Sequence, residues 1–266
     1  MGHKGSIPNP VENLTGSTNI GLGNVPDHSA VFKFGFNDAV GATFVPVCIN
    51  GIYRTPQVGS ATQLRIKAGN AADNPAGLGA QSIILEGLDA NGEFLTEVVA
   101  TNGTSAGVSS VGSFFRLFRA AVVQSGVYAT TTVRSHVGEI TVENDAGTED
   151  WAVIRLNGHA RGQTEVGAYT TPADMSAAIV DVTMSATSNQ PVDIMLMVRN
   201  NAAQTTPPYS AMRAIGEFAG LETPLVPSFK LPPVPILPLS DFIFFAKTQT
   251  SASVSVQFNL LLKRVV

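Results

Sequence analysis

Residues 81–124 read QSIILEGLDANGEFLTEVVATNG followed by TSAGVSSVGSFFRLFRAAVVQ. Two β-patterned runs meet at Asp89-Ala90-Asn91-Gly92, and an Asn102-Gly103 turn precedes a third, longer run. Asn-Gly between alternating apolar residues is a strong hairpin signal, because the central turn positions need a positive φ, which Asn and Gly tolerate best. The stretch therefore predicts a β-meander.

Short β-like runs continue on both sides of this stretch, with Gly, Asn and Pro between them. In the first 160 residues they cover 42–47, 62–68, 81–86, 93–100, 113–124, 138–142 and 152–156. No alternation of strands with helical periods is visible. Many short strands punctuated by turn residues indicate an all-β sandwich or barrel.

The C-terminal part shows clean period-two patterning, which is typical of strands with one buried and one solvated face. The apolar rows are Ala178, Val180, Val182 and Met184, then Val192, Ile194, Leu196 and Val198, and finally Val254, Val256, Phe258, Leu260 and Leu262. Residues 210–219 fit a strand or a helix, and we favour the strand. These runs predict a second β-sandwich or jelly roll.

The sequence thus predicts an all-β protein with two β-sandwich or jelly-roll-like domains and an extended N-terminal arm. We place the arm at 1–30, the first sandwich at 31–162 and the second at 163–266. The arm (Gly2 to Ala30 in particular) is rich in Gly and Pro without periodicity, so we expect a partner chain to hold it. Six prolines in Leu221–Leu239 predict an extended edge or connection that serves as a contact surface, with a Pro-rich ligand as the alternative.

Composition restricts the classes of partner. Charged residues make up 14% of the chain, against about 25% in typical soluble domains. A surface with so few charges favours association, so we expect a homo-oligomer; a monomer coated in Ser and Thr is the alternative. With a net charge of −4 and scattered Lys and Arg, no nucleic-acid-binding face is expected.

The longest apolar stretch, Leu231 to Ala246, is broken by four prolines and Asp241, so no membrane span is expected. The N-terminus lacks the apolar core of a secretion signal. The single cysteine permits no internal disulfide and is compatible with synthesis in a reducing cytoplasm.

One turn resembles the start of a calcium loop, since Asp89, Asn91 and Glu93 place oxygen ligands at alternate positions. The EF-hand pattern needs Gly at its sixth position and a bidentate Glu at its twelfth, whereas Gly92 is fourth here. A hairpin turn fits better, and a cation at these three residues stays open.

Other candidate residues have plainer structural interpretations. Cys48 lies in the apolar run FVPVCI, where a buried thiol behaves as a small hydrophobe. The histidines His3, His28, His136 and His159 have no close metal-ligand spacing. The glycine pairs at 21–23 and 77–79 lack the context of a phosphate-binding loop, and the acceptor patterns at Asn13 and Asn102 have no expected consequence without a secretion signal.

An acidic cluster precedes the single tryptophan. Its members are Glu143, Asp145, Glu149 and Asp150, followed by Trp151. Two carboxylates at a set separation across a cleft would be needed for glycoside hydrolysis, and a solvated acidic loop is the simpler interpretation. We therefore predict no catalytic, cofactor-binding or metal-binding residues and no enzyme activity.

The run from Ile49 to Ala106, followed by FFRLFRAAVVQSG, resembles a group of virion structural proteins of tailed bacteriophages. The shared features are a Gly-Leu-Asp-x-Asn-Gly turn, the Thr96-Glu97 pair, an Asn-Gly-Thr turn and an aromatic-basic strand. The segment Tyr169–Asp174 resembles the group's Tyr-Thr-Val-Pro-Ala-Gly, and Pro238–Asp241 its Lys-Ser-Asp entry to the final hairpin. Asp174 and Pro238-Leu239 depart from the group's pattern.

This resemblance implies a multi-copy, non-enzymatic component of a tailed-phage virion that stabilises or decorates the head or builds the neck or tail. Its partners would be copies of itself and other virion proteins, assembled in the host bacterial cytoplasm. Two alternatives remain: a receptor-binding adhesin, with exposed aromatic residues near Trp151 or Tyr128, and a carbohydrate-active hydrolase.

Overall fold

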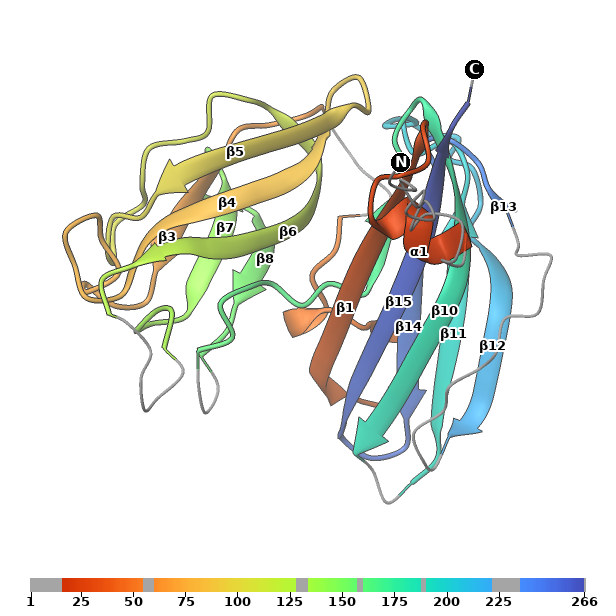
Figure 1. Cartoon of the computed structure of the whole chain (residues 1–266). Coiled ribbons are helices and arrows are strands. Elements are labelled where there is room, and N and C mark those ends of the chain that lie inside the picture. The colour runs from red at the N-terminus through yellow and green to blue at the C-terminus, as the bar shows by residue number, and fades with distance from the viewer. Residues whose placement is uncertain are drawn as a thin grey trace, which may run out of the picture.

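The computed structural model describes residues 16–54, 60–127, 134–156, 160–187, 190–221 and 235–265. The protein is all-β, with antiparallel sheets arranged in two bodies that lie side by side (Figure 1). Among the described residues, the helical elements are the short helix α1 (Gly16–Gly21) and the 3-10 turn η2 (Ile49–Gly51). The expected fold class is therefore confirmed.

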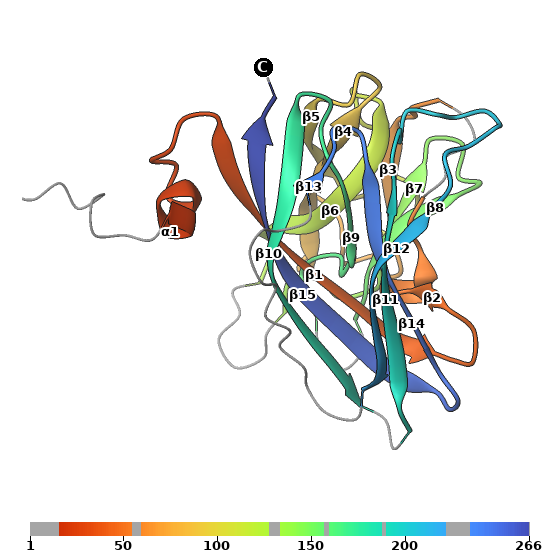
Figure 2. The same cartoon turned by 90° about the vertical axis from the view of Figure 1, so that its right-hand side faces the viewer.

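The larger body, here called the main sandwich, consists of two sheets that share one core (Figure 2). One sheet has the order β1-β15-β10-β13, and the other β12-β11-β14-β2, with β9 also paired to β14. Its strands are β1 (His28–Val40), β2 (Val45–Pro46), β9 (Ala168–Thr170), β10 (Met175–Thr187), β11 (Val192–Arg199), β12 (Arg213–Leu221), β13 (Pro235–Ile236), β14 (Asp241–Thr248) and β15 (Ala252–Arg264).

The smaller body, here called the insert sandwich, lies between β2 and β9 in the chain. Its sheets have the orders β3-β7-β8 and β5-β4-β6 around a separate core. Its strands are β3 (Leu64–Ala68), β4 (Ala80–Asp89), β5 (Phe94–Ala100), β6 (Phe114–Ser125), β7 (Ile140–Asn144) and β8 (Asp150–Ile154). Because the chain leaves the main sandwich and later returns to it, the insert sandwich is attached by two connections.

The predicted division at residue 31 does not follow the pairing of strands. Strand β1 pairs with β15 from His28↔Lys263 to Val40↔Ala252, and β2 pairs with β14. Residues 31–46 therefore belong to the same sandwich as the C-terminal strands. Local patterning could not reveal this, since the partner of β1 lies at the other end of the chain.

The predicted meander is corrected in its third strand. The β4–β5 hairpin forms as expected, but β6 pairs with β4 rather than with β5. Strand β4 alternates little and is buried along most of its length, whereas β5 is largely exposed, which suits a central and an edge strand respectively. The connection from Thr101 to Ser113 is long enough to carry the chain across to the far side of β4.

Most of the predicted apolar rows are buried. Strands β11 and β15 alternate as expected, with Val192 to Val198 and Val254 to Leu262 facing the core at every second position. In β10, Val182 and Met184 are buried, but Ala177 and Ile179 replace the predicted Ala178 and Val180. A register shift between Ile179 and Asp181 moves the row by one residue, as a β-bulge does.

The two predicted contact segments are described only in part. Of the arm, residues 1–15 lie outside the described residues, Gly16–Gly21 form α1, and β1 begins at His28. Of the proline-rich stretch, residues 222–234 lie outside them, and β13 pairs with β10 at Ala177 and Ala178. The ambiguous run at 210–219 forms the strand β12 from Arg213 onward, as we favoured.

Candidate functional site: the joint between the sandwiches

Several of the segments that carry the sequence resemblance meet in one place, here called the joint, whereas Thr96-Glu97 and the Asn102–Thr104 turn contact other parts of the insert sandwich. The joint comprises Arg116 on β6, the turn Asp89–Gly92 after β4, the segment Thr170–Asp174 after β9, and Leu239–Asp241 before β14. Ala173 N–H donates to Gly92 O at 2.9 Å, and Thr171 N–H donates to Ser240 O at 3.0 Å. The segment 171–173 thus bonds through its backbone both to Gly92 and to Ser240, which are more than 140 residues apart in sequence.

At the centre of the joint, Asp241 binds two arginines. Its Oδ1 and Oδ2 accept hydrogen bonds from Nε and Nη2 of Arg116, both at 3.0 Å, in a bidentate pair whose two side chains are fully buried. Arg199 Nη1 lies 3.3 Å from Asp241 Oδ2. The hydroxyl of Thr170 donates to Oδ1 at 2.6 Å and lies 2.8 Å from the Tyr53 hydroxyl.

Burial dominates the electrostatics of this cluster. It lowers the pKa of Arg199, and the nearby Asp241 opposes that shift. Burial also raises the pKa of Tyr53 above its ordinary value, with a further contribution from the Asp241 carboxylate. A buried pair of this kind costs desolvation free energy, and its strict geometry favours a single arrangement of the groups that it joins. The Arg116–Asp241 pair thus fixes how the insert sandwich sits on the main sandwich.

Aromatic side chains continue this contact into the core of the main sandwich. Phe118 of β6 stacks on Tyr169 of β9, with ring centroids 4.3 Å apart. Tyr169 in turn lies 6.0 Å from Phe242, and Phe242 lies 5.4 Å from Phe258. Phe118 therefore belongs to the core of the main sandwich although its strand is part of the insert sandwich.

A second ion cluster connects the two bodies beside β1. Arg155, just after β8, pairs through Nε with Glu165 at 2.9 Å and through Nη1 with Asp38 of β1 at 2.7 Å. Its guanidinium group also lies 4.1 Å from the centroid of the Phe36 ring. Burial raises the pKa of Glu165, and Arg155 opposes that shift. Two separate buried arginines thus tie the insert sandwich to the main sandwich.

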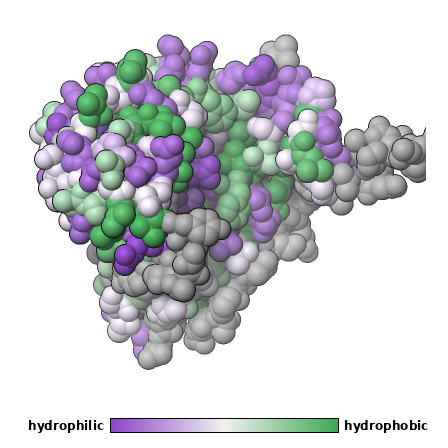
Figure 3. Space-filling view, turned by 60° about the vertical axis from the view of Figure 1, so that its left-hand side comes forward, coloured by the Kyte–Doolittle hydropathy of each residue, from purple (hydrophilic) through white to green (hydrophobic). Residues whose placement is uncertain are grey.

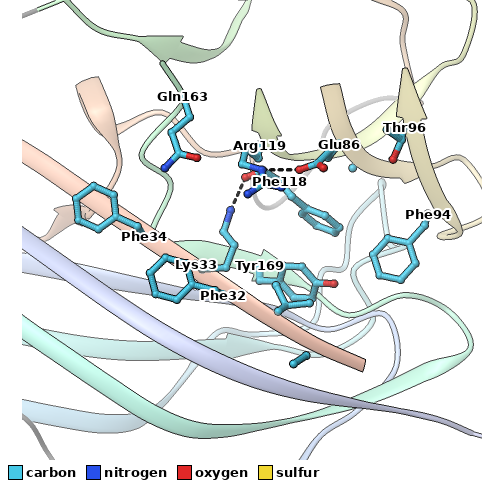
Figure 4. Close-up of a pocket in the computed structure, with 13 residues that line it drawn as sticks. Phe32, Lys33, Phe34, Glu86, Phe94, Thr96, Phe118, Arg119, Gln163 and Tyr169 are labelled. Carbon is cyan, nitrogen blue, oxygen red and sulfur yellow. Dashed lines mark hydrogen bonds and ion pairs between the residues drawn. The ribbon is translucent and has the colours of Figure 1, made fainter. Parts of the chain in front are cut away.

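A cavity of about 320 Å³ opens between β1 and the sheet β5-β4-β6. Figure 4 shows Lys33 extending from β1 toward the insert sandwich, where its ammonium group donates to Phe118 O. Burial lowers the pKa of Lys33 to about 8. Glu86 and Arg119, on β4 and β6, form an ion pair on the opposite wall.

The turn considered as a calcium loop is a hydrogen-bonded hairpin turn. Asp89 Oδ1 accepts from the backbone N–H groups of Asn91 and Glu93 at 2.8 and 2.9 Å, and Gly92 has a φ of +78°. The Asp89 carboxylate therefore caps its own turn. In the part of the chain that the structure describes, no group of three or more His, Cys, Asp or Glu residues is arranged to hold a metal ion.

Cys48, His136 and His28, the described candidates for a nucleophile or a base, each contact a different part of the chain. Cys48 is buried beside β9, and burial raises the pKa of its thiol to about 12. His136 is buried, with Nε2 3.2 Å from Arg155 O, and burial lowers its pKa. His28 lies at the start of β1 with Nδ1 2.8 Å from Pro26 O. His3 and His159 lie outside the described residues.

The acidic cluster occupies the β7–β8 hairpin, and its carboxylates bind neighbouring residues of the insert sandwich. Glu143 pairs with Arg65 at 2.7 Å, Glu149 pairs with Arg54 at 3.4 Å, and Asp145 accepts from the Ser109 hydroxyl. Asp150 is exposed at the start of β8.

Trp151, which follows the cluster, is buried, with the Arg54 guanidinium 4.1 Å from its ring. It is thus not the exposed aromatic residue that an adhesin surface would present. Tyr128, the other aromatic residue considered for an adhesin, lies outside the described residues.

Sequence reasoning missed the buried charged groups between the sandwiches, namely Arg116, Arg199 and Asp241 at the joint and Lys33 beside the cavity. A weak signal was available, since Arg116 interrupts the aromatic run FFRLF and Asp241 precedes FIFF. A charge inside an apolar strand is seldom tolerated without a partner, so each could have indicated a buried counter-ion, which the sequence analysis did not predict. The identity of that counter-ion required the structure.

None of the described helices has the length and hydrophobicity needed to cross a membrane.

No protein-family model and no curated protein matches the chain. Among solved structures, the chain is similar to a chain in the structure of infectious bursal disease virus Gt strain. The two are 12% identical, the match covers 95% of this chain and 83% of the other, and the TM-score is 0.22. It is also similar to the infectious bursal disease virus VP2 subviral particle, with 12% identity over 94% and 82%, and a TM-score of 0.19.

Proposed function

We propose that this chain is a multi-copy, non-enzymatic structural component of a tailed-phage virion, which stabilises or decorates the head or builds the neck or tail. The observation that carries the proposal is the joint. Four segments that resemble the virion proteins, around Gly92, Arg116, Ala173 and Asp241, are far apart in sequence yet contact one another there. This part of the resemblance therefore concerns residues that act together to hold the two sandwiches in one arrangement.

The roles of the candidate catalytic residues support a structural function over a hydrolytic one. Glu143 and Glu149 are engaged in ion pairs with arginines, and Asp145 binds a serine. A glycosidase needs two carboxylates that face a substrate across a cleft. The cavity next to Lys33 contains a single carboxylate residue, Glu86, which is paired with Arg119.

The test is to purify particles of the phage that encodes the chain, quantify the protein by mass spectrometry and locate it by cryo-electron microscopy. We expect many copies per particle at symmetry-related positions on the head, neck or tail. Absence of the protein from the purified particle would refute the proposal.

A triple variant addresses the hydrolase alternative. Asp145→Asn, Glu149→Gln and Asp150→Asn together should leave particle assembly unchanged, and the unmodified protein should release no sugars from host polysaccharide. Release of sugars that is lost in the triple variant would favour the hydrolase instead.

A further inference from the structure

The edge of β1 that faces the insert sandwich is open beside the cavity. Strand β1 pairs with β15 on one side only, and Ala30, Phe32 and Phe34 line the cavity together with Lys33. Within the described ranges, no backbone hydrogen bond joins residues 30–34 to the insert sandwich. Phe32 and Phe94 are each more than half exposed at the cavity's rim. An open strand edge next to exposed aromatic rings is suited to receive another extended chain.

The cavity also has an excess of positive charge. Glu86 neutralises Arg119, while Lys33 forms no ion pair with any described residue and donates only to a carbonyl. Tyr169, on the same cavity wall, is buried with a hydroxyl that has no hydrogen-bond partner in the described part of the chain. Buried polar groups of this kind usually have partners, and a carboxylate would satisfy the ammonium group.

Figure 3 shows apolar residues gathered in the hollow between the two sandwiches, with hydrophilic residues around it. The residues that line the cavity agree with this view, since Phe32, Phe94, Phe118 and Tyr169 supply apolar surface around Lys33. An occupant of the hollow therefore needs both apolar side chains and one negative charge.

We propose that residues 1–15 of a second copy of this chain add as a strand to the open edge of β1, with Glu12 of that copy paired to Lys33. This inference rests on the proposed function, because it requires many copies to assemble. It goes beyond that function by naming the two surfaces that join neighbouring copies.

The sequence of this segment fits the site. Glu12 is the only acidic residue in positions 1–15, and Ile7, Val11 and Leu14 supply apolar side chains near it. In a strand, the N–H groups of alternate residues point to the same edge, so Pro8 and Pro10 remove donors from one edge only. Such a segment can pair with one neighbour, as a strand added at the edge of a sheet does. Fully extended, it reaches roughly 50 Å beyond Gly16, enough to extend to a neighbouring copy.

Photo-crosslinking tests which segment occupies the edge. Full-length protein with p-benzoylphenylalanine in place of Phe32 is mixed as nitrogen-15-labelled and unlabelled copies, irradiated and analysed by mass spectrometry. We expect crosslinks between position 32 of one copy and residues 5–15 of another. Crosslinks confined to one chain, crosslinks to other segments, or none at all would each overturn the proposal.

Charge variants test the ion pair. Glu12→Gln and Lys33→Met should each raise the dissociation constant of self-association by about tenfold or more. Sedimentation velocity measures this constant. The double variant Lys33→Glu with Glu12→Lys, which exchanges the two charges, should restore most of the self-association. Glu139→Gln, at an exposed position of the insert sandwich, is the matched control and should change nothing.

Glu12→Gln tests the proposal independently of Lys33→Met, because it leaves the Lys33 side chain and its cavity unchanged. Equal self-association of the Glu12→Gln and Glu139→Gln proteins would overturn the proposal. If these experiments overturn the strand-addition proposal but the protein is present in particles, the proposed function still stands. Absence from particles would remove that function whatever the crosslinks show.

Discussion

Asp241 is the residue on which the joint depends, because its one carboxylate lies between two buried guanidinium groups. Removing a partner from such a cluster leaves uncompensated charge inside the protein. The large cost arises from the remaining arginines rather than from the strength of the original pair. Stability should therefore respond far more to Asp241 than to any exposed aspartate.

We expect Asp241→Asn to lower the free energy of unfolding by about 3–5 kcal/mol, as measured by urea denaturation. The control is Asp174→Asn, which removes the half-exposed pair between Asp174 and Arg264. That change should cost about 0–1 kcal/mol. Similar losses in the two variants would show that the buried cluster has no special importance for stability.

Lys33 should make stability depend on pH in a defined window. Its folded pKa of about 8 lies below the ordinary value of 10.5, so between these values the unfolded state binds more protons than the folded state. The free energy of unfolding then rises with pH. The desolvation cost is fully present below pH 8 and is relieved as the pH rises toward 10.5.

The Lys33→Met protein isolates this effect, because all other titrating groups are the same in both proteins. We expect Lys33→Met to be more stable than the original protein at pH 7 by on the order of 3 kcal/mol, with most of that advantage gone near pH 10.5. Urea denaturation of both proteins across this range, at a concentration where each is monomeric and Lys33 has no Glu12 partner from another copy, measures the difference. A difference in stability that stays constant with pH would contradict a lowered pKa of Lys33 in the folded protein.

At the scale of elements, the turn between β4 and β5 has a second role beyond reversing the chain. Gly92 has a φ of +78°, and a Cβ at this position would lie 2.5 Å from Leu239 Cδ2 and 3.2 Å from Ala173 Cβ. The residue is thus needed both for the turn and for close contact with the main sandwich. Sequence patterning explains only the first of these needs.

Gly92→Ala should therefore lower the free energy of unfolding by about 2–4 kcal/mol, from a left-handed backbone and a steric clash together. Gly23→Ala is the matched control, because Gly23 has a φ of +73° with no atom within 4 Å of a Cβ. The control should lose only about 1–2 kcal/mol. Thermal or urea unfolding of both variants gives the comparison.

Several strand positions could be predicted from the sequence, but β1 and β14 were not among the predicted runs, and the partners of the strands could not be predicted. Period-two patterning located β11 and β15, because each has one face toward a single core. The bulge after Ile179 left no local signal, and neither did the position of β6 beside β4. These features depend on contacts between distant segments, which no local pattern records.

Dependence on contacts between distant segments also explains which parts of the joint could be predicted from the sequence. The sequence analysis singled out Asp89, Asn91 and Gly92 as a turn, and local hydrogen bonds hold them as one. Arg116 and Asp241 are 125 residues apart, so their pairing could be found only from the fold. The candidate residues that the sequence did suggest were conspicuous by type rather than by position.

For the whole molecule, the joint should make the two sandwiches unfold together. Trp151 is the only tryptophan and reports on the insert sandwich, whereas far-UV circular dichroism reports on both bodies. In urea, we expect the fluorescence and dichroism transitions of the original protein to coincide.

Phe118→Ala should separate the two transitions, because it removes the ring that joins the insert sandwich to Tyr169. The control, Leu260→Ala, lies within the main sandwich and should shift both transitions equally. Coincident transitions in the Phe118→Ala protein would show that the aromatic contact does not couple the bodies.

The position of β15 in its sheet has a consequence for how the protein is made. This last strand lies between β1 and β10, so β1 has no partner in the sheet until residues 252–264 have left the ribosome. The insert sandwich, in contrast, contains all of its own strands and can form midway through synthesis. During the remaining translation, β1 is exposed on both edges, and the nascent chain is at its most prone to aggregate in that interval.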